Sequence, residues 1–221
     1  MLAACLTVLA GAPAATADAV HDALVSAVPA QGTPRILDGQ VLTITQVGSV
    51  MLAGGTFTSV DAAQGAATTR GLVAFDPASG EPVAGFDSGI DGEVYSLAAG
   101  PVAGTVFVGG RFTTAGGAAA SNLALLDVTT GRQVPGFASH CIDGIVRDLE
   151  VVGPHLLVGG TFTWINGAQR GGLASLSPAT GAVDSYLTVA LTERHGSADG
   201  AVGPVGATAL TGPVFHNVIE P

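Results

Sequence analysis

The fold is decided by a motif that occurs three times: an apolar run, a pair of glycines, and then the segment x-Phe-Thr. The copies read Met51-Leu52-Ala53-Gly54-Gly55-Thr56-Phe57-Thr58, Val106-Phe107-Val108-Gly109-Gly110-Arg111-Phe112-Thr113 and Leu156-Leu157-Val158-Gly159-Gly160-Thr161-Phe162-Thr163. The glycine pairs recur at offsets of 55 and 50 residues. A fixed period of this length is typical of repeat architectures and outweighs local propensity.

Two further blocks accompany each copy in constant order. A second apolar segment follows it, at residues 72–76, 123–127 and 173–177, and closes on Gly80, Gly131 or Gly181. An Asp-Gly-x-Val segment precedes it and begins at Asp38, Asp91 or Asp143. Three blocks at near-constant spacing indicate three related units rather than chance similarity.

Each unit is predicted to contain four short antiparallel strands. In the second unit these strands are 94–98, 105–113, 122–127 and 133–137, separated by turns rich in Gly, Pro or Asp. The third unit has Asn166-Gly167, the pair most favoured in tight hairpins. We therefore predict an all-β fold of four-stranded β-propeller blades, because a sandwich has no reason to repeat its sequence. The double glycine is expected to mark a bulge or a close approach between neighbouring sheets.

The motifs hhhGG-x-F-T and L-A-h-h-D-x-x-T/S-G resemble the delta-60, kelch-like repeats of secreted bacterial β-propellers. The resemblance covers about residues 35–187 and departs from kelch proper, because Trp164 is the only tryptophan. It implies an extracellular or wall-associated interaction module, often followed by further adhesive domains.

The chain is accordingly divided into a signal peptide (1–19), a linker (20–34), three blades (35–187) and a linker with an incomplete fourth blade (188–221). The run 202–210 resembles the opening strand of a fourth unit. A propeller closes with four to eight blades, so this pattern predicts an open or truncated ring. Unpaired faces at its two ends would make the fragment marginally stable or oligomeric.

The N-terminus has the chemistry of an export signal. An apolar run at 2–10 precedes Ala-x-Ala sites at 15–17 and 17–19, and it is too short to span a bilayer. The first positive residue is Arg35, which indicates a start codon assigned too far downstream or a weak signal. Residues 2–5, Leu-Ala-Ala-Cys, also fit a lipoprotein cleavage box. The expected location is secreted, with no membrane span in the mature chain.

Charge and composition exclude several classes of protein. The formal net charge is −10 and there is no lysine, so nothing is available to neutralise nucleic-acid phosphates. The 33 glycines and 12 prolines disfavour a helical bundle, and 11% charged residues are too few for a disordered chain. No cofactor is expected.

Five carboxylates are candidate binding residues on the rim of the predicted channel: Asp38, Asp91, Asp143, Asp148 and Glu150. The first three could hold Ca²⁺ or a cationic group, or could simply be good turn residues. Strict alternation along the first strand of each unit places Ser96 on the face of Val94, and Asp148 and Glu150 on the face of Val146. This pair could then divide acid and base roles.

Other reactive residues give weaker signals. Cys141 would be the single thiol after signal cleavage, either buried, paired with another chain, or left without its partner. Adjacent residues of an extended segment point to opposite sides, so His140 is badly placed to activate it. No metal-binding pattern is present. Phe57, Phe112 and Phe162 are predicted to pack in the core.

The prediction from sequence is therefore an exported, non-enzymatic β-propeller segment of a cell-surface interaction protein. Its partners would be an unknown extracellular protein or glycan, and missing blades or another chain at the open edges. Two alternatives stay open: a propeller-scaffold enzyme acting on extracellular polysaccharide through Asp148 and Glu150, and a purely structural spacer. Fold alone does not distinguish them.

Overall fold

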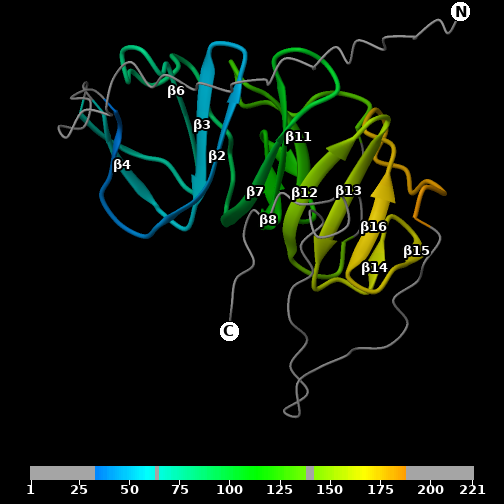
Figure 1. Ribbon diagram of the computed structural model, residues 1–221. Helices are drawn as coiled ribbons and strands as arrows, with labels where there is room; N and C mark the ends of the chain where they lie inside the picture. The colour runs from blue at the N-terminus through cyan, green and yellow to red at the C-terminus, as the bar shows by residue number, and fades with distance from the viewer. Residues whose placement is uncertain (1–32, 63–64, 138–141, 188–221) are drawn as a thin grey trace, which may run out of the picture. The chain divides into compact units, whose positions relative to one another are not determined.

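The computed structural model describes residues 33–62, 65–137 and 142–187, which form strands, turns and bends without a helix (Figure 1). These residues belong to one compact unit. They include no helix with the length and apolarity needed to cross a bilayer. The predicted signal segment, Cys5, Cys141 and residues 188–221 lie outside the described residues. The prediction of an all-β, antiparallel chain is confirmed for the part described.

Three three-stranded antiparallel sheets share one strand order, with the second strand in the middle. Sheet 1 comprises β2 (Val41–Val47), β3 (Val50–Gly55) and β6 (Leu72–Phe75). Sheet 2 comprises β7 (Glu93–Ala99), β8 (Thr105–Arg111) and β11 (Leu123–Asp127). Sheet 3 comprises β12 (Val146–Val152), β13 (His155–Gly160) and β16 (Leu173–Leu176).

Shorter strands form between the second and third strands of each sheet, and one of their partners, β1, precedes sheet 1 in the chain. They are β4 (Ser59–Ala62) with β5 (Gly65–Thr68) and β1 (Arg35–Ile36), β9 (Thr114–Ala115) with β10 (Ala118–Ala119), and β14 (Trp164–Ile165) with β15 (Ala168–Gln169). Asn166 and Gly167 both have positive φ, 47° and 83°, in the β14–β15 turn. This is the backbone that a type I′ hairpin requires, so the predicted Asn-Gly turn is confirmed.

Four-stranded sheets are not formed in the described residues. At the predicted fourth strand 133–137, a single bridge joins Gln133 to Leu126 of β11. Pro135 has no backbone N–H, and Gly136 has φ 93°, so the ladder cannot continue. Corresponding single bridges join Phe75 to Pro82 and Leu176 to Val183.

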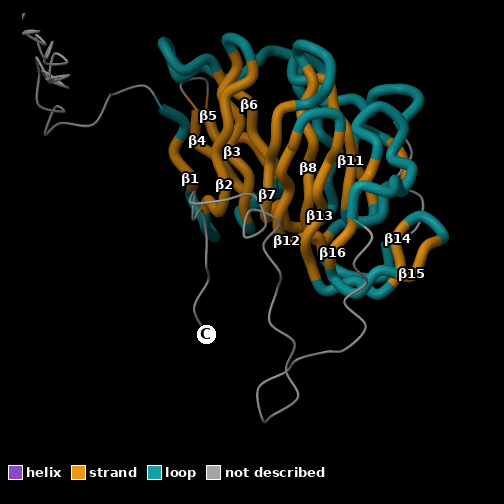
Figure 2. Tube along the Cα trace, turned by 45° about the vertical axis from the view of Figure 1, so that its right-hand side comes forward, coloured by secondary structure: helices purple, strands orange, loops and turns teal. Residues whose placement is uncertain are grey.

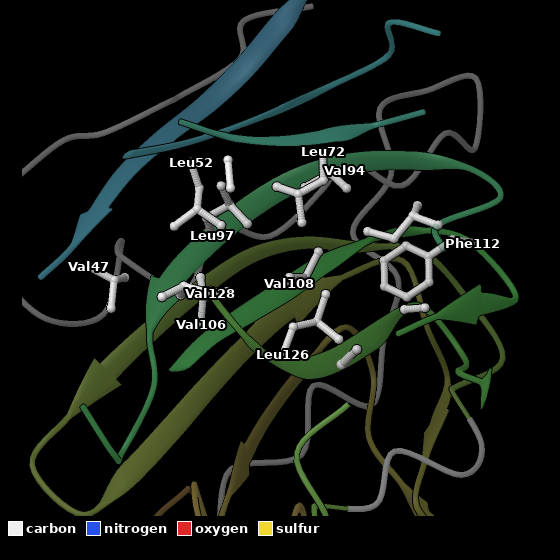
Figure 3. Packing of buried hydrophobic residues seen from close by; sticks show 14 of the residues in the cluster. Val47, Leu52, Leu72, Val94, Leu97, Val106, Val108, Phe112, Leu126 and Val128 are labelled. Carbon is white, nitrogen blue, oxygen red and sulfur yellow. The ribbon is translucent and has the colours of Figure 1, made fainter. Parts of the chain in front are cut away.

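The three sheets pack face to face in chain order, and their first strands β2, β7 and β12 are neighbours (Figure 2). One apolar core lies between sheets 1 and 2. In Figure 3, Leu52 and Leu72 of sheet 1 lie against Leu97 and Val94 of sheet 2. A second core lies between sheets 2 and 3 and contains Phe107.

The two glycines of each pair have different roles. A Cβ on Gly54 would lie 2.6 Å from Val94 Cγ1, and one on Gly109 would lie 2.6 Å from Val146 Cγ1. The first glycine therefore makes room for the next sheet. A Cβ on Gly110 would lie 2.0 Å from the backbone oxygen of Glu93, so the second glycine makes room within its own sheet. Gly55 and Gly160 meet the oxygens of Gln40 and Ile145 in the same way, at 1.9 and 2.0 Å.

A bulge in the first strand of each sheet overturns the predicted alternation. The register shifts between Val41 and Thr43, between Val94 and Ser96, and between Val146 and Asp148. The extra residues are Leu42, Tyr95 and Arg147. An inserted residue reverses the faces of everything after it, so the prediction that Ser96 shares the face of Val94 was wrong.

The observed faces follow from the packing. Val146 and Leu149 both point to sheet 2, because a Cβ on Gly109 would meet both side chains, at 2.6 and 3.0 Å. Asp148 and Glu150 flank Leu149 in unbroken register and therefore share the opposite face. They remain on one side of β12, as predicted, but away from Val146.

Candidate functional site

Asp38, Asp91 and Asp143 each tie a turn before the first strand of a sheet to the x-Phe-Thr segment. Asp91 accepts hydrogen bonds from the backbone N–H of Thr113 (2.8 Å) and Thr114 (3.0 Å) and from the Thr113 hydroxyl. Asp38 bonds Thr58 and Ser59, and Asp143 bonds Thr163 and Trp164, in the same way. These contacts favour the turn interpretation for all three residues.

The hydrogen bonds also set the acidity of these carboxyl groups. The Thr58 hydroxyl holds the pKa of Asp38 below its usual value. Desolvation raises the pKa of Asp91 and Asp143, but the bonds from Thr113, Thr114, Thr163 and Trp164 outweigh it and the pKa of both is lowered. The described residues contain no group of three His, Cys, Asp or Glu side chains able to hold a metal ion. Ligand binding at this rim stays a prediction.

Asp148 and Glu150 lie on β12. Asp148 Oδ1 accepts a hydrogen bond from the Ser96 hydroxyl at 3.4 Å and from the N–H of Leu149 at 3.0 Å. Ser96 Oγ in turn accepts the Leu149 N–H at 3.1 Å. Asp148 thus helps to join β7 to β12. Glu150 shares its face, and the catalytic role of this pair is untested.

A polar cluster that sequence reasoning missed lies on the first strands of sheets 2 and 3 and at the end of β8; we call it the inner-strand cluster and define it as Glu93, Tyr95, Arg111 and Arg147. Arg111 binds Glu93 with two hydrogen bonds, Nη2–Oε1 at 3.0 Å and Nε–Oε2 at 3.2 Å. The Tyr95 hydroxyl donates to the same carboxylate. The guanidinium carbon of Arg147 lies 4.5 Å from the centre of the Tyr95 ring.

Electrostatics in this cluster couple both arginines to the carboxylate of Glu93. Glu93 has a lowered pKa, first because of the Tyr95 hydrogen bond and then because of Arg111. Burial, reinforced by Glu93, raises the pKa of Tyr95. Arg147 Nε is a buried donor without an acceptor among the described residues, and its guanidinium adds to the lowered pKa of Glu93.

Tyr95 and Arg147 could have been identified as neighbours from sequence only if the position of the bulge in each first strand had been predicted. Both are the extra residue of their strand, so neighbouring sheets bring them together although 52 positions separate them. The available signal was their shared place in the repeat, one residue after the Val of the Asp-Gly-x-Val segment.

A second missed cluster lies on sheet 3 and comprises His155, Ser175, Asp184 and Tyr186. Asp184 accepts a hydrogen bond from Ser175 Oγ at 2.6 Å and lies 2.8 Å from His155 Nδ1. The His155 ring stacks on Tyr186 with centroids 4.1 Å apart, and its side chain is 25% exposed.

This second cluster is not a catalytic triad. The carboxylate sits between serine and histidine, so the imidazole does not contact the hydroxyl whose proton it would have to take. Ser175 is also fully buried. Burial raises the pKa of Asp184, but bonds from His155 and Ser175 outweigh it and the pKa is lowered. The cluster is a partly buried polar contact at sheet 3, with Ser175 buried and Tyr186 exposed.

Comparison with known protein families and with curated proteins found no match for this chain. The candidate site therefore rests on geometry: the inner-strand cluster is where unsatisfied donors, an aromatic ring and partial exposure coincide.

Proposed function

We propose that the chain is a sector of an exported β-propeller that acts as a surface-interaction module rather than as an enzyme. The observation that carries the proposal is the repeated packing of the sheets. Val94 on Gly54 and Val146 on Gly109 join successive sheets by one rule, with the first strands adjacent. Face-to-face repetition of this kind is how propeller blades follow one another.

Four-stranded blades are part of the same proposal. Beyond each third strand, the backbone continues with paired hydrogen bonds, such as Val134 N to Leu125 O and Asp127 N to Arg132 O, both 2.9 Å. These bonds support a fourth strand that would begin at this point. In a complete blade this outer segment would extend further along the third strand.

The face of sheet 1 that carries Val41 and Ile44 supports a ring in which another sheet packs against it. Val41 and Ile44 are 39% and 63% exposed, whereas Val94 and Leu97, at the same positions of sheet 2, are 0% and 8% exposed. Side chains built for an interface are left uncovered here. A further sheet would bury them.

The ligand-contacting surface in this proposal is the inner-strand cluster. Arg147 carries an Nε that finds no acceptor among the described residues, and Tyr95 and Arg147 belong to neither core between the sheets. The test is biolayer interferometry of the purified chain against a panel of neutral and uronate-bearing extracellular polysaccharides. We expect binding that weakens at least about tenfold in Arg147→Gln. Arg132→Gln, in a turn of sheet 2, is the matched control and should bind as the parent does.

Equal binding by Arg147→Gln and the parent would remove the cluster from the proposal. The alternative, a polysaccharide-cleaving enzyme, has one supporting observation, the shared face of Asp148 and Glu150. It predicts release of reducing ends that disappears in Asp148→Asn and Glu150→Gln. We expect no release from the parent protein.

A further inference from the structure

The β14–β15 hairpin carries the single tryptophan of the chain on its surface. Trp164 is 49% exposed, whereas Ile165 beside it is fully buried and joins the hairpin to the core between sheets 2 and 3. The corresponding residues of the other units, each the one after the Phe-Thr pair, are Ser59 and Thr114. Exposure of this much indole surface to water is unfavourable, so its presence in one unit calls for a contact outside the fold.

The turn itself does not need the indole. The backbone N–H of Ser59, of Thr114 and of Trp164 donates to the aspartate of its own unit, at 2.9, 3.0 and 2.8 Å. A small hydroxyl residue therefore forms the same backbone contact in units 1 and 2 as tryptophan does in unit 3.

Hydrogen bonds hold the hairpin in place before any ligand binds. The carbonyl of Trp164 accepts the N–H of Asp143 at 3.3 Å, and Asn166 Nδ2 donates to the carbonyl of Gly181 at 2.6 Å. Asn166 and Gly167 form the turn with positive φ. A surface that is fixed in advance loses less conformational entropy when a ligand docks on it.

Gln169 places an amide beside the indole. It pairs with Trp164 across the two-stranded ladder, so the two side chains share a face, with Cβ atoms about 5 Å apart. Gln169 is exposed, and its amide offers two donors and an acceptor. In unit 2 the corresponding pair is Thr114 and Ala119. The ring and the amide thus occur together in unit 3 and are both missing from unit 2.

The chemistry of this face fits a neutral sugar. Residues 163–169 carry no charge, and the carboxylate of Asp143 is occupied by the N–H and hydroxyl groups of the hairpin. A pyranose with equatorial hydroxyls has axial C–H bonds, so its apolar face packs on indole while hydroxyls at its edge bond to an amide. A protein hot spot needs a ring of packed side chains around it, but the neighbours exposed here are Gly167 and Gln169.

We propose that Trp164 and Gln169 form a binding site for neutral pyranose chains whose hydroxyls and linking bonds are equatorial. The site goes beyond the proposed function, which places binding at the inner-strand cluster. Figures 1 and 2 both show β14–β15 at one end of sheet 3 and away from β7, which carries Tyr95. One ring and one amide on an open surface bind weakly, so this site adds to the affinity of the module rather than setting it.

Trp164 itself reports the binding, because no other tryptophan contributes to the fluorescence of the chain. The full chain is titrated with cellohexaose, whose glucose units are linked equatorially, and with maltohexaose, whose glucose units are linked through an axial bond. We expect cellohexaose to shift the tryptophan emission and to protect the indole from acrylamide quenching. Maltohexaose should bind at least about fivefold more weakly. The response to cellohexaose should be unchanged in Arg147→Gln.

Two substitutions that introduce the residues of unit 2 test the side chains with the least disturbance of the fold. By isothermal titration calorimetry, Trp164→Thr should weaken cellohexaose binding at least about tenfold, and Gln169→Ala about threefold. Tyr186→Ala is the matched control, because Tyr186 is 48% exposed but its ring is stacked on His155. It should bind as the parent does, and circular dichroism and thermal unfolding check that each variant folds.

Tryptophan emission that cellohexaose leaves unchanged in the folded parent would overturn the proposal. Equal binding of cellohexaose by Trp164→Thr and the parent would overturn it too, as would an equal loss in Tyr186→Ala. A cellohexaose response that is lost in Arg147→Gln would overturn the independence of the hairpin site. A response that persists in Arg147→Gln, together with unchanged polysaccharide binding by that variant, would contradict the inner-strand cluster and support the hairpin site.

Discussion

Sheets 1 and 2 carry similar apolar residues at corresponding positions of their first strands, and those residues have opposite environments. Val41 and Ile44 of β2 are 39% and 63% exposed, while Val94 and Leu97 of β7 are 0% and 8% exposed. The local backbone is the same, with a bulge after each valine. Strand formation and bulging are therefore properties of the unit, whereas burial depends on a preceding sheet.

An aspartate introduced at Ile44 or at Leu97 should separate the stability of the unit itself from the stability gained by burial against a preceding sheet. Leu97→Asp buries an unpaired carboxylate in the core between sheets 1 and 2, and we expect it to lower the free energy of unfolding by about 4 kcal/mol or more. Ile44→Asp places the same charge in water and should change it by less than about 0.5 kcal/mol. Urea unfolding followed by circular dichroism measures both, and comparable losses would show that the face of β2 is covered in solution.

Substitution of the second glycine of each pair should destabilise sheets 1 and 2 equally, because its contacts lie within its own sheet and do not depend on a neighbouring sheet. A Cβ on Gly55 or Gly110 meets a backbone oxygen of its own sheet, at 1.9 or 2.0 Å. Backbone cannot swing aside as a side chain does, so Gly55→Ala and Gly110→Ala should each cost about 3 kcal/mol. Gly109→Ala meets side-chain atoms of sheet 3 and should cost about 1–2 kcal/mol. Thermal unfolding measures all three, and a mild Gly55→Ala would break the assignment of a local role.

The Asp turns should show the smallest effects, similar in both sheets. Asp38→Asn and Asp91→Asn weaken bonds made within one unit, so each should lower the thermal midpoint by a few degrees at pH 7. The folded pKa of each aspartate is lowered, so its contribution is present above the unfolded value of about 3.9. It is lost as pH falls through the folded pKa.

The effect of both substitutions should therefore shrink as pH falls through the lowered folded pKa of each aspartate, because the native carboxyl group then becomes protonated. Thermal midpoints measured between pH 2 and pH 7 check this, and a difference from the parent that persists unchanged at pH 2 would contradict it. Asp61→Asn, on the exposed surface of β4, is the matched control for loss of a negative charge.

Much of the fold could be predicted because repeated glycines indicate close backbone contacts and repeated phenylalanines indicate buried positions. The GG-x-F-T motif predicted the middle strands and buried Phe57, Phe112 and Phe162, which are 0%, 3% and 2% exposed. Asn166-Gly167 predicted its hairpin because few other residues accept φ above zero in succession. The fourth strand was overestimated because Pro135 and Gly136 outweigh the apolar residues beside them.

The candidate site was less accessible from sequence because its residues meet only through the bulges. Alternation placed Ser96 with Val94, and the inserted Tyr95 reversed that assignment. Asp91 and Asp143 were found as turn residues, but their oxygens are taken by Thr113 and Thr163. Arg147 was not predicted as a site residue, because the sequence of its own strand gives no sign that its guanidinium lies against the ring of Tyr95.

The sequence by itself determined local conformation: where strands form, where glycine must stand, and which aspartates close turns. Each of these depends on contacts within one unit of about fifty residues. Only the tertiary structure decided which faces are buried and which charges meet, because Val94 and Val41 both follow an Asp-Gly-x segment in sequence but have different neighbours in space. The bulge links the two levels, since one inserted residue in each first strand sets the side of the sheet on which every later side chain lies.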